Sequence, residues 1–448
     1  MSNKPLTLGT QSIGSLLLHY SLPAIIAMTA SSLYNMMDSM FIGHGIGPLA
    51  LAGLSATFPF MNLGAAFGAM VGAGASTVVS VKLGQQDYES ANRAMGNVVL
   101  LNVGIGFLFS VVCLLFLDPI LYFFGASDNT IGYARDYMVV ILLGNIITHL
   151  YLGLNSVLRS SGHPREAMNV TLISVALNFI FNYIFVFVVH WGIRGVAIGT
   201  ILAQIIALIM VMRYFVKPSS VLKLKAEFLQ FSVAISKQIL SIGLAPFCMN
   251  TLACLVVTLI NTGLQKYGGD LHVAAYGIDN RIVFFFVMIN MGFNQGMQPI
   301  AGYNYGAKKY SRVLEVFRYT LYCVVPFGMI GWIACQFMPE WIVAMFSTDE
   351  QLNALSSYGL RVLTCLLPLI GFQMVCTNLY QSIGKAKIAI FLSTTRQLLF
   401  LIPFLLVLPR YWGTDGVWWS LPLADGLSVL VVSVMIIKLI RELKTEPA

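Results

Sequence analysis

Apolar residues gather into long stretches that are separated by short polar connections along the whole chain. Each stretch is long enough for an α-helix to cross a bilayer, which takes about 20 residues. Inside the hydrocarbon only helices and closed barrels can satisfy their own backbone groups. The pattern therefore predicts an all-α integral membrane protein. We place its twelve transmembrane helices at residues 15–43, 48–80, 94–117, 131–158, 166–189, 194–215, 234–264, 272–302, 313–338, 352–382, 386–408 and 415–438.

The composition of the chain supports this prediction. Of the 448 residues, 58% are hydrophobic and only 10% are charged, whereas a soluble domain carries about 25% charged residues. No polar connection is long enough to form a soluble domain. The seven cysteines all fall in apolar segments without CxxC spacing, so we interpret them as buried small hydrophobes and not as metal ligands.

The distribution of basic residues predicts the orientation. An even number of spans puts both termini on the same side of the membrane. Of the 26 Lys and Arg residues, 19 fall in the two termini and the even-numbered loops or at the span ends next to them, and 4 fall in or next to the other loops. The remaining three, Arg281, Arg361 and Arg396, fall deeper inside spans. The positive-inside rule then predicts cytoplasmic termini. The net charge of +8 is therefore a topology signal and not a sign of nucleic-acid binding.

The two halves of the chain repeat each other at a nearly fixed spacing. Gly84-x-x-x-Tyr88 matches Gly306-x-x-x-Tyr310 at a separation of 222 residues (306 − 84 = 222). Three further matches keep this order: Gly74 with Gly296, Ser160-x-Gly162 with Ser382-x-Gly384, and Trp191-Gly192-x-x-Gly195-Val196 with Trp412-Gly413-x-x-Gly416-Val417. Because six spans separate the copies, both point the same way, and parallel repeats of this kind are typical of transporters. We predict a first lobe at residues 1–218, a cytoplasmic linker at 219–232 and a second lobe at 233–448.

One carboxylate, Asp38, lies in the first apolar stretch, on the same helical face as Ser31 and Tyr34. An acid at that depth costs about 2.5–3.5 kcal/mol on insertion scales, so it marks a functional site by default. A bound cation, a proton or a buried base could each account for it. The fifth stretch offers a matching polar stripe in Asn178 and Asn182.

Polar residues also mark the second half of the chain. Asn290 and Asn294 repeat at a four-residue spacing in the eighth span, which fits either interhelical hydrogen bonding or the lining of a polar cavity. Asp425 lies near the middle of the twelfth span. Because intramembrane charges tend to pair, we predict that Asp425 pairs with Arg396 or Arg281. A second protonation or substrate-binding role for Asp425 is the alternative.

Taken together and in order, the motifs of this chain resemble the MATE (multidrug and toxic compound extrusion) transporters, and the prokaryotic multidrug branch in particular. The resemblance covers essentially the whole length. It rests on Ser21-Leu22-Pro23, Asp38, Gly72-x-Gly74, Arg159-x-x-Gly162, Leu177-Asn178, Gly195-Val196-Ala197-x-Gly199-Thr200 and Gly416-Val417-Trp418.

The resemblance implies two pseudo-symmetric six-helix lobes that form a V-shaped cleft and alternate access to it. It implies a secondary active antiporter, which exports organic cations or other amphipathic compounds in exchange for H⁺ or Na⁺. It also implies a location in the plasma (inner) membrane of a bacterium or archaeon. Such a protein is not an enzyme, needs no cofactor, contributes to antibiotic resistance and works as a monomer among membrane lipids.

The cation site that the resemblance implies for the first lobe falls on Asp38, Asn178, Asn182 and Thr200. Close relatives carry an acid where this chain has Asn182, so we expect weaker Na⁺ binding, and either H⁺ or Na⁺ remains open as the coupling ion. All four side chains offer oxygen, the ligand atom that Na⁺ prefers. The same amides can hydrogen-bond either protonation state of Asp38.

Further positions complete the expected site. The resemblance places Tyr34 and Asn155 along the cavity of the first lobe, and Ser31 and Met37 are neighbouring candidates for substrate binding. Pro23 lies near the start of the first span, where its missing N–H and its ring favour a kink. We predict that this helix bends when its acid changes charge; a static kink is the alternative.

Other functions account for part of the pattern. A flippase for a lipid-linked precursor, from the same superfamily, needs a basic central cavity, and Arg281, Arg361 and Arg396 keep that alternative open. An intramembrane enzyme needs clustered acids or a Ser/His pair, which we do not find. A channel needs a pore-lining motif, usually from several subunits, whereas a two-lobe repeat favours alternating access. The predicted partners are therefore small organic cations or drugs, and no nucleic acid.

Overall fold

The computed structural model of the chain describes residues 7–217, 220–346 and 349–445, and the side chains of residues 33–36, 43, 44 and 48 lie outside the described part. Within those ranges the secondary structure is helical throughout, without a strand. Eleven helices of the described ranges are long and apolar enough to cross a membrane, and one bent pair of helices passes the same test when it is taken as a single span, which gives twelve. The chain is therefore an all-α, multi-pass membrane protein, as its hydrophobic pattern predicts.

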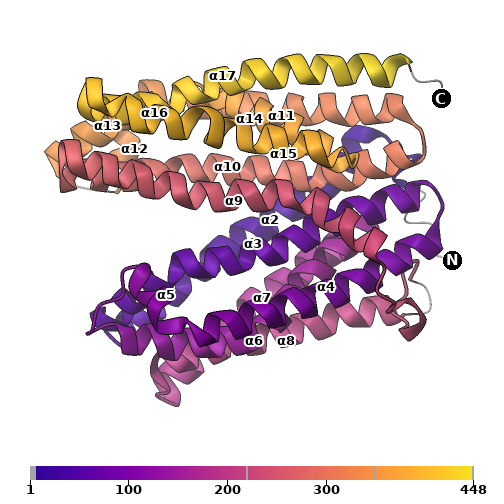
Figure 1. Cartoon of the computed structure of the whole chain (residues 1–448), viewed down its shortest axis with the longest axis horizontal. Helices are drawn as coiled ribbons and strands as arrows, with labels where there is room; N and C mark the ends of the chain where they lie inside the picture. The colour runs from indigo at the N-terminus through magenta and orange to yellow at the C-terminus, as the bar shows by residue number, and fades with distance from the viewer. Residues whose placement is uncertain (1–6, 218–219, 347–348, 446–448) are drawn as a thin grey trace. The chain divides into compact units, whose positions relative to one another are not determined.

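The helices group into two compact units, and the first unit consists of residues 26–247 together with residues 1–10. In this unit α6 (Ile131–Ser160) packs against α3, α4 and α8, and Figure 1 shows it beside α8. The other elements of this unit are α3 (Pro48–Gly84), α4 (Tyr88–Leu115), α5 (Leu117–Phe123), α7 (Pro164–Tyr183), the π-helix η1 (Ile184–Val188), α8 (Gly192–Val216) and the 3-10 helix η2 (Ala226–Phe228).

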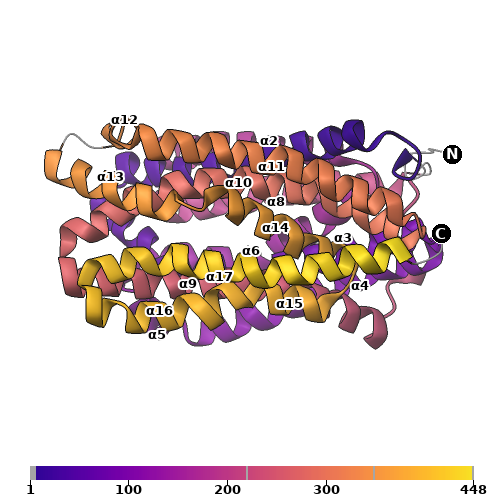
Figure 2. The ribbon, with the colours of Figure 1, turned by 90° about the horizontal axis from the view of Figure 1, so that it is seen from above.

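The second unit consists of residues 11–25 and 248–448. Here α10 packs against α11, α13 and α14, and α17 runs along α14 and α16 (Figure 2). Its elements are α10 (Asp270–Gly306), α11 (Tyr310–Phe337), α12 (Pro339–Ala344), α13 (Glu350–Thr364), α14 (Leu367–Ser382), α15 (Ala386–Thr394), the π-helix η3 (Thr395–Leu401), α16 (Ile402–Val407) and α17 (Pro409–Thr445).

Two long helices, α2 (Ile13–Gly45) and α9 (Val233–Gly268), contribute to both units. The first part of α2, up to Ile25, packs in the second unit, and the first part of α9, up to Phe247, packs in the first unit. The predicted lobe boundaries at residues 218 and 233 thus stay a prediction, since each of these helices has its two parts in different units.

Matched glycines make both of these packings possible. A Cβ at Gly74 in α3 would lie 1.9 Å from the carbonyl oxygen of Ile239 in α9. A Cβ at Gly296 in α10 would lie 2.1 Å from the hydroxyl of Ser21 in α2. These two glycines occupy matching positions in the sequence repeat, so the repeat preserves a close helix approach of the small-residue kind.

Prolines account for the irregular spans. The predicted span at residues 352–382 consists of α13 and α14, which are bent by 44° at Cys365–Leu366. Pro368 in the first turn of α14 lacks the N–H that a continuous helix needs. In the eleventh span η3 is followed by α16, whose second residue is Pro403. This proline removes another intrahelical hydrogen bond and favours the wider turn.

The described part of the linker, residues 220–232, is held against the start of α4. Asn92 accepts a hydrogen bond from the backbone N–H of Lys223 at 2.6 Å, and Asn97 accepts one from the backbone N–H of Ser232 at 2.8 Å. A Cβ at Gly96 would lie 2.0 Å from the carbonyl oxygen of Phe228. The described part of the linker is therefore packed against α4 and does not extend freely from the protein.

We predict that Gly74→Ala lowers the stability of the chain by about 1–3 kcal/mol, because the new methyl group overpacks the contact with the Ile239 backbone. Gly104→Ala is the matched control, since a Cβ there meets nothing within 4 Å. Thermal unfolding of the purified chains in detergent measures the difference. Equal unfolding midpoints for the two variants would contradict the close approach of α9 to α3.

Candidate functional site

The four residues predicted for the cation site form one hydrogen-bonded chain inside the first unit. Asn182 Nδ2 donates to Asp38 Oδ1 at 2.6 Å and to Asn178 Oδ1 at 3.2 Å. Asn178 Nδ2 in turn donates to Thr200 Oγ1 at 3.1 Å. The structure thus brings together side chains that lie up to 162 residues apart in the sequence (200 − 38 = 162).

Three helices position this chain of polar groups, which we call the Asp38 network. α2 contributes Asp38, α7 contributes both asparagines on one face because they are four residues apart, and α8 contributes Thr200. Asp38 is 4% exposed and both asparagines are fully buried. Gly199 lies beside the network, and a Cβ there would lie 2.6 Å from Asn182 Oδ1. Gly199 therefore leaves the space that Asn182 occupies.

The electrostatics of the Asp38 network depend on one acid. Among the described residues no Lys or Arg forms an ion pair with Asp38, and no three His, Cys, Asp or Glu side chains cluster as metal ligands. Tyr137 of α6, which is buried, lies within electrostatic reach of Asp38. Asn182 Oδ1 is buried and has no hydrogen-bond partner within the described ranges. The network therefore offers one ionisable group, surrounded by amides and a hydroxyl.

Sequence reasoning missed Tyr137 and Gly199 as parts of this site. Gly199 is next to Thr200 in the motif that opens the sixth span, so the sequence carried a signal for it. Tyr137 is one tyrosine among 19 on a separate helix, and only the packing of α6 reveals its position.

The residues predicted to line a substrate cavity have different environments. Asn155 of α6 is buried and donates to Thr171 Oγ1 of α7 at 3.2 Å, while its Oδ1 has no hydrogen-bond partner among the described residues. Ser31 donates to the carbonyl oxygen of Ala27 on its own helix at 2.9 Å and is exposed. Met37 is half-buried, and the side chain of Tyr34 lies outside the described part.

Pro23, the predicted hinge, lies inside α2 between two close contacts in the second unit. On one side Ser21 packs against Gly296, and on the other side Ile25 packs against Gly292, where a Cβ would lie 2.3 Å from Ile25 Cγ1. After Ile25 the helix belongs to the first unit. The proline thus stands directly before the point where α2 passes from one unit to the other.

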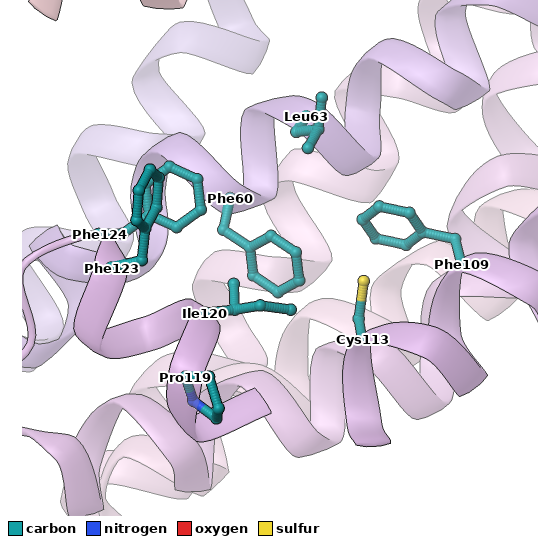
Figure 3. Close-up of a pocket in the computed structure, with 8 residues that line it drawn as sticks. All are labelled: Phe60, Leu63, Phe109, Cys113, Pro119, Ile120, Phe123 and Phe124. Atoms are coloured by element: carbon teal, nitrogen blue, oxygen red, sulfur yellow. The ribbon is translucent and has the colours of Figure 1, made fainter. Parts of the chain in front are cut away.

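The first unit also contains an apolar cavity that the sequence did not indicate (Figure 3). Its volume is about 350 Å³. It lies among α3, α4 and α5, and its walls carry no charged side chain. The lining residues are Phe60, Leu63, Phe109, Cys113, Pro119, Ile120, Phe123 and Phe124. Such a cavity can accept an apolar group but offers nothing that selects for charge.

In the second unit the predicted ion pair of Asp425 is made with Arg396 of η3, whose Nε donates to Asp425 Oδ1. Arg281, the other predicted partner, is exposed on α10. The amides of Asn290 and Asn294 are buried, and their Oδ1 atoms have no hydrogen-bond partner within the described part. The pairing of Asp425 follows the general tendency of intramembrane charges.

Comparison with known proteins also shows two repeated halves in this chain. The MatE family model matches the chain twice, at residues 23–184 and 246–407. The two matches begin 223 residues apart (246 − 23 = 223), close to the spacing of the repeated motifs.

Individual relatives match over nearly the whole length. The multidrug export protein MepA of Staphylococcus haemolyticus is 28% identical over 437 residues, which cover 98% of this chain and 96% of that protein. A solved structure of an outward-facing multidrug resistance MATE family transporter of the MOP superfamily has a TM-score of 0.92 at 22% identity, covering 100% of both chains. A MATE structure in the bent conformation has a TM-score of 0.93 at 22% identity, with 99% of each chain covered.

We predict that Arg396→Met destabilises the chain by about 3–5 kcal/mol, because it leaves the buried carboxylate of Asp425 without its partner. The double variant Arg396→Met/Asp425→Leu should recover most of that loss, since no charge then remains buried. A double-mutant cycle of thermal unfolding in detergent measures both effects. A double variant no more stable than Arg396→Met would show that the pair contributes more than compensation of charge.

Proposed function

Because this chain belongs to the MatE family of membrane transporters, we propose that it exports drug-like organic compounds by antiport against an inward-moving cation. The relatives that it resembles over nearly their full length carry the name multidrug export protein. We place the coupling site at the Asp38 network. One observation carries this assignment. Asp38 is a buried intramembrane acid that is hydrogen-bonded by an amide, and no basic residue of the described part forms an ion pair with it.

The Asp38 network can serve both charge states of its acid. When Asp38 is ionised, the N–H of Asn182 stabilises the carboxylate through a charge-assisted hydrogen bond. When Asp38 takes up a cation or a proton, its charge is removed and the network relaxes. A change between the two states alters the hydrogen bonding of α2 with α7, which gives the ion a means of changing the shape of the first unit.

The single carboxylate of the Asp38 network favours a proton over Na⁺ as the coupling ion. Asn182 is a neutral amide that donates its N–H to Asp38, so it adds no negative charge that would attract Na⁺. One carboxylate is enough for a proton, because Asp38 itself carries it. We therefore propose H⁺ coupling, with Na⁺ as the competing outcome of the experiment below.

We further propose that the cycle is one of alternating access in a plasma membrane, with both termini in the cytoplasm. The orientation follows from the distribution of Lys and Arg. Organic cations and drugs are the proposed substrates, and the polar groups of Asn155 and the Asp38 network are the proposed contacts of the first unit. We propose that a single chain, surrounded by lipid, carries out the whole cycle.

The flippase alternative loses support from the arginines that suggested it. Arg396 is paired with Asp425, and Arg361 is exposed and pairs with Glu340 at 2.8 Å. Two of the three intramembrane bases are thus already neutralised, and a pyrophosphate would have to displace their carboxylate partners.

We predict that Asp38→Asn reduces proton-driven ethidium efflux from proteoliposomes to the level of protein-free vesicles, because the amide cannot carry the proton. The measurement imposes a pH gradient and, separately, a Na⁺ gradient. Asp136→Asn is the matched control, since this exposed acid of α6 belongs to a surface ion pair with Arg194 of the kind that contributes little. Full efflux by Asp38→Asn would exclude the Asp38 network as the coupling site.

Asn182→Asp identifies the ion in the same assay. A second carboxylate beside Asp38 attracts Na⁺ through a second charge, so the variant should gain efflux under the Na⁺ gradient alone, which the proton-coupled wild type lacks. Efflux of the wild type under the Na⁺ gradient alone would establish Na⁺ as its coupling ion and overturn the proton assignment.

We predict that Pro23→Ala slows efflux by about tenfold or more without lowering the unfolding midpoint. Alanine restores the backbone N–H and removes the roughly 3 kcal/mol that proline costs in a helix interior, so a straight α2 is favoured. Initial rates in proteoliposomes and unfolding in detergent measure the two quantities. Normal efflux in this variant would mean that the proline is a static feature of α2.

A further inference from the structure

A second acid, Asp279 of α10, is buried in the second unit and has no part in the Asp38 network. It is the tenth residue of its helix, so it lies about 14 Å along the axis from the helix start. Its side chain is 0% exposed. The hydroxyl of Ser356 in α13 donates to Asp279 Oδ1 at 2.5 Å, and Asp279 Oδ2 has no hydrogen-bond partner among the described residues.

The second carboxyl oxygen of Asp279 faces an apolar corner where three helices meet. A Cβ at Gly359 of α13 would lie 2.4 Å from Asp279 Oδ2 and 2.6 Å from the ring of Trp418 in α17. The ring of Trp418 is itself buried and packs edge-on against Tyr276 at 6.1 Å between centroids. The absent side chain of Gly359 therefore leaves room for the carboxyl group beside an indole ring.

No cation balances Asp279 within the described part of the chain. The ionisable groups near it are the phenol of Tyr276 on α10 itself and the thiol of Cys335 on α11. Arg396 of η3 lies within electrostatic reach of Tyr276, but its charge is balanced by Asp425 of α17. A buried carboxylate in such surroundings is costly, and the neutral acid is the form that fits them.

We propose that Asp279 is a second proton-binding site of this protein, separate from the Asp38 network and located where α10, α13 and α17 meet. The hydroxyl of Ser356 can donate to the carboxylate or accept from the acid, so it serves both states. The surroundings of Asp279 are poorly suited to Na⁺. One hydroxyl, a glycine and an indole ring do not supply the oxygen ligands that this ion requires.

The bend after α13 provides a route by which this proton can exchange. α13 carries both Ser356 and Gly359, and it is separated from α14 by the 44° break at Cys365–Leu366. In this proposal a tilt of this 15-residue helix about the break uncovers Asp279, and the proton exchanges while α13 is displaced.

The test is an infrared titration of the purified chain in lipid, which follows the carbonyl band of protonated carboxylic acids as the pH is raised. In the background Asp38→Asn we expect one remaining acid band that disappears at high pH and is absent from Asp38→Asn/Asp279→Asn. Asp270→Asn, at the exposed start of the same helix, should keep the band. An unchanged band in Asp38→Asn/Asp279→Asn would overturn the proposal.

Two further variants keep the test decisive if Asp279→Asn folds poorly. Ser356→Ala keeps the carboxyl group and should move the midpoint of the titration while leaving the amplitude of the band unchanged. In the wild type the fluorescence of Trp418, obtained by difference from Trp418→Phe, should change with the same midpoint, because its ring lies beside Asp279. The site would be refuted if Asp279→Asn changed neither the pH dependence of the Trp418 fluorescence nor the amplitude of the acid band. Neither measurement involves efflux, so a failure of the proposed transport function would leave this result readable.

Discussion

A polar side chain in the hydrocarbon of a bilayer has no water to bind, so its partners must come from other helices of the same protein. In this chain that constraint ties together helices that are remote in the sequence. Asp38 of α2 is held by Asn182 of α7, and Arg396 of η3 holds Asp425 of α17. Each contact fixes the rotation of a helix, because only one face of that helix can bring the polar group to its partner. The rest of the packing is built from apolar and small residues around these fixed points.

The two copies of the repeat share a close helix packing but carry different polar residues. Gly74 and Gly296 occupy matching positions and allow the same close approach of a helix backbone in each unit. The polar residues do not match: the first unit has a lone acid among amides and a hydroxyl, whereas the second has Asp425 paired with an arginine and Asp279 bonded to a hydroxyl. The space available at a close helix contact is the same in both copies, so the glycine is kept in both. The charge balance of an acid depends on the side chains around it, and these differ between the copies.

The neighbours of an acid, and not its depth, decide what it can do. Asp425 is compensated by Arg396, so it can stay ionised and serve as a structural charge. Asp38 and Asp279 are as deeply buried but have hydrogen-bond donors in place of a cation. Donors stabilise a carboxylate without fixing it in the ionised form, which leaves these two groups suited to taking up and losing a proton. Their separation into different units would allow each unit to respond to its own proton.

The sequence by itself determined the helical membrane fold, because the length and period of apolar runs follow directly from bilayer thickness and helix geometry. It also indicated the Asp38 network, since acids and amides in apolar spans are few enough to be matched by spacing and by family resemblance. Only the tertiary structure decided that α2 and α9 divide between the two units, that Arg396 and not Arg281 pairs with Asp425, and that Asp279 and Trp418 meet at Gly359. The physical reason is that pairing and burial depend on which faces of distant helices meet, and that depends on the packing of the whole unit and not on any local pattern.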